Sequence, residues 1–223
     1  MKLVTHTFMT LDGVMQGPGG AEEDPSGGFG HGGWLVPLSD ADMGMIVESW
    51  FARTEAILLG RNTYEMMRGY WSQVTDPANG VAAKLNHGRK YIVSNTTTHA
   101  DWGDSTVVRG DVIGQVADIK KGGRGELQVH GSARLAQALH TAGLIDEYRL
   151  LVFPVTVGAG KRLFTDDAPP RGYSLLESRT TRAGAVYQVL APKAFEAGAW
   201  PCKMAGRPPG SGKRSSTTTA SPT

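Results

Sequence analysis

Cysteine is almost absent from this chain, because Cys202 is the one cysteine among 223 residues. A single cysteine closes no internal disulfide and forms no thiolate metal cluster, so no metal site is expected. Apolar runs of about 18 residues, the length of a membrane span, are missing as well. The first residues lack the apolar stretch of a signal peptide. Together these absences favour a cytoplasmic protein that does not enter the membrane.

A strong charge of either sign is lacking too. The formal net charge is +2, and the segment 196–223 accounts for it with four basic residues and one acidic residue. The rest of the chain is close to neutral, so its net charge does not indicate nucleic-acid binding. With 40% hydrophobic and 20% charged residues, the composition is that of a soluble globular protein.

The composition divides the chain into two parts. Gly, Pro, Ser and Thr fill 16 of the 28 positions in residues 196–223. Such a segment buries too little apolar surface to offset its ordering entropy, so we expect a disordered tail. Residues 1–195 are predicted to form a single folded domain, because their length and patterning suit one core.

Strands and helices alternate within residues 1–195. A helix is expected to begin at Ser39, with Asp42 completing a variant of the capping box, and nine glycines in residues 13–33 indicate a long functional loop. Strands separated by helices predict an α/β fold with a mixed, mostly parallel sheet and an antiparallel edge hairpin. The expected strands are residues 3–10, 56–60, 90–94, 127–130 and 148–157, and the hairpin consists of residues 175–180 and 185–190.

Three strand-to-helix junctions carry small or basic residues. In open α/β sheets, ligands bind beyond the C-terminal ends of the strands, where helix N-termini offer free N–H groups to phosphate. Each junction alone is equally consistent with an ordinary strand end. Three on one sheet favour a long phosphorylated ligand such as a dinucleotide. The junctions are Gly60-Arg61-Asn62-Thr63, Ser94-Asn95-Thr96 and Gly131-Ser132-Ala133.

Two blocks of sequence resemble a known family. Residues 10–13 (TLDG), then residues 59–65 (LGRNTYE), then Gly131 at the start of a helix, resemble in this order the dihydrofolate reductase superfamily. Residues 143–148 (GLIDEY), 153–155 (FPV) and 158–164 (GAGKRLF) look specifically like the reductase domain of the riboflavin-pathway deaminase/reductase, the RibD C-terminal domain family. The resemblance covers roughly residues 1–192, and the zinc motifs of the deaminase half are missing.

The resemblance implies a dihydrofolate-reductase-like, three-layer α/β/α fold and a homodimeric, NADPH-dependent oxidoreductase. Its reaction would be hydride transfer to a heterocyclic or C=N-containing small molecule, as in 5-amino-6-(5-phosphoribosylamino)uracil reductase of riboflavin biosynthesis. Two alternatives are a dihydrofolate or pterin reductase and a non-catalytic, dimeric NADPH-binding protein. Against a folate reductase, Ser39 stands where such enzymes place a carboxylate after a Trp-x-x-Pro segment.

The resemblance also implies roles for particular residues. The first junction would bind the 2′-phosphate and pyrophosphate of NADPH, the second would lie along the adenosine, and the third would hold the pyrophosphate. The backbone around Met9 and residues 14–15 would face the nicotinamide. The implied cofactor-binding residues are Met9, Val14, Met15, Gly60, Arg61, Asn62, Thr63, Ser94, Asn95, Gly131, Ser132 and Ala133.

Two residues are candidates for catalysis. His130 stands where riboflavin-type reductases carry a glutamate, and it is either structural or a substrate contact and proton donor, since histidine titrates near neutral pH. Asp12 either shapes a turn or faces the ligand.

Two further pairs of residues also have alternative roles. Lys161 and Arg162 are either a solvated pair or a binding site for a substrate phosphate. His31 and Trp34 either cover the nicotinamide as a lid or anchor the glycine-rich loop.

Overall fold

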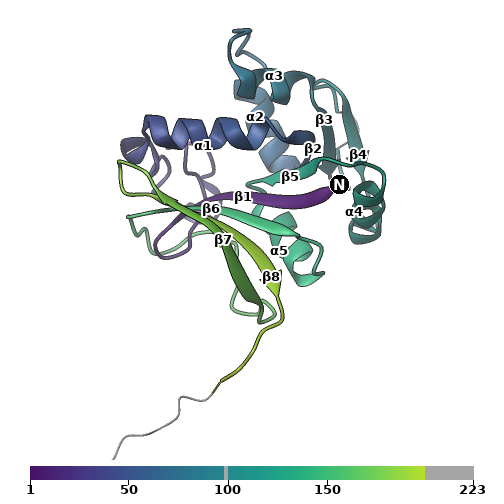
Figure 1. Cartoon of the computed structure of the whole chain (residues 1–223). Helices are drawn as coiled ribbons and strands as arrows, with labels where there is room; N and C mark the ends of the chain where they lie inside the picture. Colours follow the sequence, from purple (N-terminus) through teal and green to yellow (C-terminus); the bar gives the residue numbers. More distant parts are fainter. Residues whose placement is uncertain (98–99, 199–223) are drawn as a thin grey trace, which may run out of the picture.

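The computed structural model describes residues 1–97 and 100–198, which form one eight-stranded sheet and five α-helices (Figure 1). From residue 199 onward, the predicted disordered tail lies outside the described residues. The strands are β1 (Lys2–Thr10), β2 (Thr54–Gly60), β3 (Arg89–Val93), β4 (Ser105–Val108), β5 (Glu126–His130), β6 (Glu147–Phe153), β7 (Gly172–Thr180) and β8 (Val186–Lys193). The helices are α1 (Ala41–Phe51), α2 (Arg61–Trp71), α3 (Gly80–His87), α4 (Val112–Lys121) and α5 (Ala133–Thr141), with 3-10 turns at Ser26–Gly28 and Val36–Leu38.

The strand order is β4-β3-β2-β5-β1-β6-β8-β7. The first six strands in this order run parallel. β8 is antiparallel to β6, and β7 is antiparallel to β8. The predicted mixed sheet with an antiparallel edge hairpin is therefore confirmed. In this topology the C-terminal ends of β1 to β6 all lie along one edge of the sheet.

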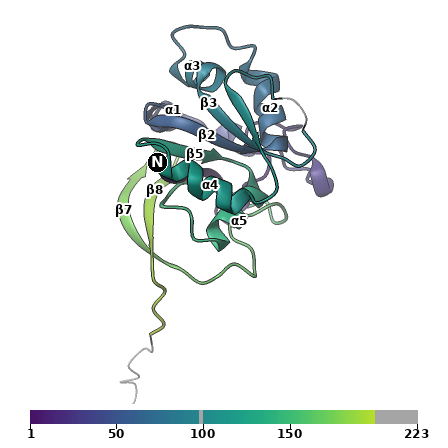
Figure 2. The ribbon, with the colours of Figure 1, turned by 90° about the vertical axis from the view of Figure 1, so that its right-hand side faces the viewer.

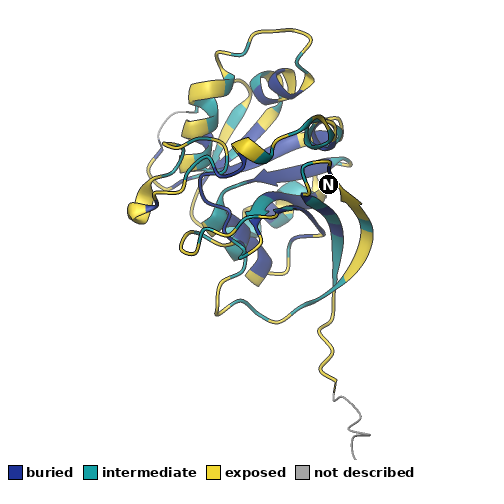
Figure 3. Ribbon diagram, turned by 90° about the vertical axis from the view of Figure 1, so that its left-hand side faces the viewer, coloured by how far each residue is buried: buried dark blue, intermediate teal, exposed yellow. Residues whose placement is uncertain are grey.

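Helices cover both faces of the parallel part of the sheet (Figure 2). Successive side chains of β2 point to opposite faces of the sheet. Ile57 and Leu59 pack with Leu85 of α3 on one face, and Leu58 packs with Leu139 of α5 on the other. The edge strand β7 is largely exposed (Figure 3). No helix in the described ranges has the length and apolar character needed to cross a membrane.

The start of α1 differs from the prediction. Asp40, and not Ser39, is the N-cap, and its carboxylate accepts a hydrogen bond from the Met43 N–H at 2.8 Å. Asp42 completes no capping box. Its carboxylate instead accepts hydrogen bonds from Arg182 in the β7–β8 turn, and this contact ties the hairpin to α1.

Two short elements were not predicted from the sequence, and one strand is shorter than expected. The eight-residue helix α3 is capped by Asn79, whose side chain accepts a hydrogen bond from the Ala82 N–H at 3.0 Å. The four-residue strand β4 extends the sheet beyond β3. The strand expected over residues 148–157 ends at Phe153, because Pro154 has no N–H to continue the ladder.

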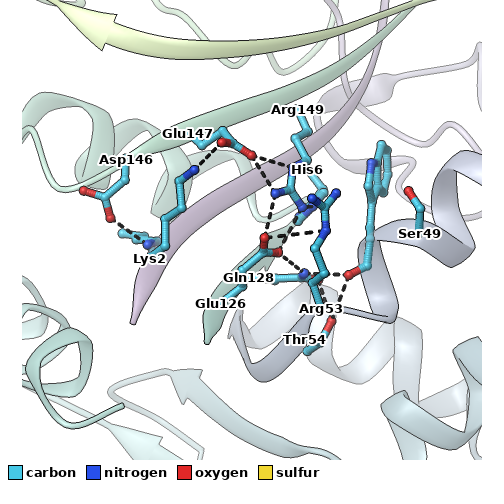
Figure 4. Close-up of polar contacts among 12 residues, drawn as sticks. Lys2, His6, Ser49, Arg53, Thr54, Glu126, Gln128, Asp146, Glu147 and Arg149 are labelled. Atoms are coloured by element: carbon cyan, nitrogen blue, oxygen red, sulfur yellow. Dashed lines mark hydrogen bonds and ion pairs between the residues drawn. The ribbon is translucent and has the colours of Figure 1, made fainter. Parts of the chain in front are cut away.

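A buried polar layer lies on the α1 face of the central strands (Figure 4). The side chain of Arg149 is 2% exposed, and its guanidinium pairs with Glu126 at 2.7 Å and Glu147 at 2.6 Å. Its Nη1 also lies 3.2 Å from Nε2 of His6. On the outer side Lys2 pairs with Glu147. The two buried carboxylates therefore depend on the buried cation between them.

Candidate functional site

The structure brings together the three junctions predicted from the sequence. The Gly60 N–H donates to Oγ of Ser132 at 2.9 Å, and the Ser132 N–H donates to Oγ1 of Thr63 at 3.2 Å. Nη1 of Arg61 donates to Oγ1 of Thr96 at 2.9 Å. The ends of β2, β3 and β5 thus form one continuous surface at the C-terminal edge of the sheet.

The two helices that begin at this surface lack side-chain caps. α1, α3 and α4 each have an Asp or Asn side chain on a first-turn N–H. α2 and α5 have Gly60 and Ser132 as N-caps, and neither makes a side-chain capping hydrogen bond. The free N–H groups and positive ends of these two helices therefore face the same region, which suits a ligand with two phosphates.

The turn at residues 131–132 has an unusual backbone. Gly131 and Ser132 have φ of +54° and +55°, and Ser132 is the one non-glycine residue with positive φ in the described ranges. Left-handed conformations cost a residue with a Cβ about 1 kcal/mol. Oγ of Ser132 accepts from the Gly60 N–H and donates to the His130 carbonyl at 3.1 Å. The turn therefore retains backbone strain, and such strain is commonly found at functional sites.

This geometry predicts the order of stability of two variants. Ser132→Ala keeps the strained φ and removes both hydrogen bonds, so we expect a loss of about 1 to 2 kcal/mol. Ser132→Gly loses the same bonds but relieves the strain, and should unfold at a higher urea concentration than Ser132→Ala. Urea unfolding of both variants and the wild type measures this order. An alanine variant at least as stable as the glycine variant contradicts it.

The second junction forms a compact turn. Oγ of Ser94 accepts hydrogen bonds from the N–H groups of Thr96, at 3.2 Å, and Thr97, at 2.9 Å. Oδ1 of Asn95 accepts from the Gly110 N–H at 3.4 Å. Asn95 and Thr96 are exposed, whereas Ser94 is buried. Ser94 therefore shapes the turn, and Asn95 and Thr96 are exposed at this edge of the sheet.

Val14 and Met15 lie beyond the end of β1, and their side chains are buried. The Val14 N–H donates to Oγ1 of Thr10 and its carbonyl accepts from the Thr10 N–H, both at 2.9 Å. The Met15 N–H donates to the Lys161 carbonyl at 2.8 Å. The Val14 carbonyl thus has a protein donor, whereas no N–H group in the described part of the chain donates to the Met15 carbonyl.

Asp12 joins two loops. Its carboxylate accepts hydrogen bonds from Oγ1 of Thr10 at 2.5 Å and from the Gly158 N–H at 2.7 Å. The bond from Thr10, and then that from Gly158, hold the pKa of Asp12 below its ordinary value. The residue therefore stays ionised at neutral pH and ties the β1 end to the loop around Gly158. This geometry supports the turn-forming alternative and argues against Asp12 as a proton donor.

His130 points into the core rather than toward the edge. Its ring stacks between those of His6 and Phe51, with centroids 4.7 and 4.8 Å away, and its Nε2 lies 3.1 Å from Oε1 of Gln128. Burial, and then the charge of Arg149, lowers the pKa of His130 to about 3. A histidine that is neutral at physiological pH does not supply a proton, so the geometry supports the structural alternative for His130.

The glycine-rich loop is docked on the 158–162 segment. Nε1 of the buried Trp34 donates to the Gln16 carbonyl at 2.8 Å, so Trp34 anchors the loop rather than covering a ligand. Nζ of Lys161 pairs with Asp24 at 2.5 Å. Arg162 donates to the carbonyls of Asp12 and Gly158. Both cations thus hold loops together, and His31 is exposed.

Sequence reasoning missed two exposed arginines at the same edge. Arg134 lies in the first turn of α5, and Arg109 follows the last residue of β4. Arg134 could have been found by reading one residue past the third junction. Arg109 was missed because β4 was not predicted.

Comparisons with known proteins agree with this architecture. The family model of the RibD C-terminal domain matches residues 1–187. YyaP, an uncharacterized protein of Bacillus subtilis (strain 168), is 27% identical over 187 residues, which are 83% of this chain and 92% of that protein.

Solved structures show the same fold at low identity. A candidate riboflavin biosynthesis protein from Shewanella sp. PV-4 superposes with a TM-score of 0.65 at 21% identity, over 86% of this chain and 99% of that one. Dihydrofolate reductase from Enterococcus faecalis, crystallised with NADP(H), gives a TM-score of 0.55 at 12% identity, over 86% and 96% of the two chains. The chain therefore belongs to the RibD C-terminal domain family and has the dihydrofolate-reductase-like fold.

Proposed function

We propose that this protein is an NADPH-dependent reductase that transfers hydride to a heterocyclic or C=N-containing small molecule. The observation that carries the proposal is the pair of uncapped helix starts, α2 and α5, on one surface with the guanidinium of Arg61. Family membership supports a reductase of the riboflavin-pathway type.

The residues of this edge fit the parts of a nicotinamide dinucleotide. The first turns of α2 and α5 would hold the pyrophosphate, and Gly131 lets the backbone approach it because no Cβ intervenes. Arg61 would pair with the 2′-phosphate, and Asn95 would lie along the adenosine. The Met15 carbonyl would accept a hydrogen bond from the nicotinamide carboxamide. When bound, the cofactor supplies the hydride, and the protein supplies alignment.

The folate-type alternative is disfavoured by the start of α1. Folate-reducing members need a carboxyl group that helps to protonate the pterin. Hydrogen bonds from the Met43 and Ala183 N–H groups hold the pKa of Asp40 below its ordinary value. The hydrogen bond from Arg182 does the same for the pKa of Asp42. Both carboxylates are therefore ionised and already bound, and Ser39 carries no acid.

Cofactor binding tests the proposal directly. Titration followed by nicotinamide fluorescence should show saturable binding of NADPH. Arg61→Ala should weaken NADPH by about tenfold and NADH much less, because the lost bond is charge-assisted and specific to the 2′-phosphate. Arg124→Ala is the matched control, since Arg124 is exposed and precedes β5 at the opposite edge. No NADPH binding at millimolar concentration would refute the proposal.

Turnover separates a reductase from a non-catalytic binder. Oxidation of NADPH should appear with at least one member of a panel of pyrimidine, pterin and flavin-precursor substrates. Tight NADPH binding without turnover on any of them would favour the non-catalytic alternative. The homodimer implied by the family resemblance stays a prediction, and analytical ultracentrifugation measures it.

A further inference from the structure

The segment that leads into α3 contains the one asparagine–glycine pair of the chain. Asn79 is followed by Gly80, whereas Asn62, Asn86 and Asn95 are each followed by a residue with a Cβ. Because glycine has no Cβ, its backbone nitrogen can approach the preceding side chain closely. Gly80 is exposed, and a Cβ built on it would meet nothing within 4 Å. The space around this pair is therefore open.

The cap of α3 polarises the Asn79 side chain. Its Oδ1 accepts a hydrogen bond from the Ala82 N–H at 3.0 Å, at the positive end of the helix dipole. Both effects draw electron density from the carboxamide carbon Cγ and would stabilise negative charge that develops on Oδ1. Gly80 is the first residue of α3, so its N–H has no intrahelical acceptor. An activated carboxamide and an unheld backbone nitrogen are therefore linked through one residue.

A reaction between these two groups needs a local opening of the helix start. Asn79 has φ of −82° and ψ of +94° in the folded chain, and rotation about ψ is needed to bring the Gly80 nitrogen onto Cγ. The cap on Ala82 and the first helical bond, from the Ala83 N–H to the Asn79 carbonyl at 3.0 Å, cannot both persist during this rotation. Helix ends fray, and the preceding residues 75–78 are exposed. The opening therefore does not require global unfolding.

We propose that Asn79 is a site of spontaneous deamidation. The Gly80 nitrogen attacks Cγ of Asn79 and forms a new C–N bond. The bond from Cγ to the side-chain nitrogen breaks, and this nitrogen leaves as ammonia with the proton of the Gly80 N–H. Water then opens the resulting succinimide ring at either carbonyl and gives aspartate or isoaspartate, in which the backbone runs through the side-chain carbon. Water is the one further reactant, and no electrons are transferred to or from the protein.

The two products act on α3 in opposite directions. Aspartate still accepts the bond from the Ala82 N–H and adds a negative charge at the helix N-terminus, which stabilises the helix. Isoaspartate lengthens the backbone by one carbon and removes the geometry of the cap. Val81 and Leu85 of α3 belong to the core cluster that also contains Ile57 of β2. Formation of isoaspartate should therefore weaken the packing of α3 on the sheet, whereas formation of aspartate should not.

Mass spectrometry of aged protein tests the proposal. The folded wild type and Gly80→Ala are incubated at mildly alkaline pH, and samples are digested with trypsin at intervals. Cleavage after Arg68 and Lys84 releases residues 69–84, in which Asn79 is the one asparagine. Deamidation at residue 79 should be about tenfold faster than at the other three asparagines, and Gly80→Ala should slow it about tenfold, because the added Cβ hinders the attacking nitrogen.

A synthetic peptide of residues 69–84 is the positive control, since it has no folded helix to open and should react faster than the protein. If the peptide reacts and the folded protein does not, the cap protects Asn79 and the proposal is overturned. Faster deamidation at Asn62, Asn86 or Asn95 overturns it as well.

Urea unfolding measures the effect of each product on stability. Asn79→Asp should unfold at the same urea concentration as the wild type or at a higher one. Aged wild type, in which an isoaspartyl methyltransferase assay detects isoaspartate, should unfold at a lower concentration. An isoaspartate-containing protein as stable as fresh protein would contradict the inferred role of the cap.

Discussion

Replacement of Arg149 with methionine is expected to destabilise the protein by about 3 to 5 kcal/mol. Its guanidinium is buried between Glu126 and Glu147 and donates hydrogen bonds to both. Methionine fills a similar volume but leaves two buried carboxylates without their shared cation. Urea unfolding at pH 7 measures the loss. A loss below about 1 kcal/mol would show that water or another cation replaces the guanidinium.

Two further measurements make this prediction specific. Adding Glu126→Gln and Glu147→Gln to the methionine variant should restore much of the lost stability, because no uncompensated charge stays buried. A lower pH should also reduce the difference in free energy of unfolding between the wild type and Arg149→Met. Burial works to raise the pKa of Glu126, but Arg149 outweighs it and the pKa lies below the ordinary value of 4.5. The stabilisation is therefore complete above pH 4.5 and is lost as the pH falls further.

Replacement of Gly160 with alanine is expected to destabilise the protein by about 2 to 5 kcal/mol. Gly160 has φ of +148°, and a Cβ there would lie 2.5 Å from Cγ1 of Val14 and 3.2 Å from Cε2 of Phe29. This glycine therefore allows the 158–162 segment to pack against the residues that follow β1. Gly158 provides a control in the same loop, since its φ is +82° and a Cβ would meet nothing within 4 Å.

The comparison of the two glycine variants isolates packing from backbone strain. Gly158→Ala should cost only about 1 kcal/mol, from the left-handed backbone alone. In a double-mutant cycle, Val14→Ala should recover part of the loss in Gly160→Ala, because it removes the methyl group that the new Cβ would strike. Urea midpoints give all four free energies of unfolding. Equal losses in the two glycine variants, or strict additivity in the cycle, would refute this role of Gly160.

Much of the fold could be predicted because its signals are local. Asp111 caps α4 as expected, and its carboxylate accepts from the Gly114 N–H. The hairpin around residues 182–184 forms as predicted. The missed elements are short, since β4 has four residues and α3 has eight. So few residues give little periodicity to detect, although Asn79 before residues 80–87 is a capping signal that could have been used.

The site was partly predictable for a topological reason. Parallel strands place all their C-terminal ends at one edge, so the meeting of Gly60, Ser94 and Gly131 follows from the fold class. The strand order is non-local information, and it decides that Ser132 contacts Gly60 and Thr63 directly. No sequence pattern indicated the positive φ of Ser132.

The burial of His130 could not be predicted from the sequence pattern of β5. Polar and apolar residues alternate in β5, which usually indicates one solvated face. Here both faces are covered, and all five residues of β5 are buried. The polar face therefore forms a buried network with Arg149 and His6 instead of meeting solvent or ligand. A single sequence does not reveal this, because the partners come from β1 and β6.

Residue-resolved hydrogen exchange with and without NADPH tests the central claim most directly. The cofactor is expected to slow exchange of the first-turn N–H groups of α2 and α5, residues 61–63 and 133–135, and of the 94–97 turn. The first turns of α1, α3 and α4, which side chains already cap, should be unchanged. Saturable binding that protects none of the uncapped turns, or protects residues at the opposite edge of the sheet, would contradict it.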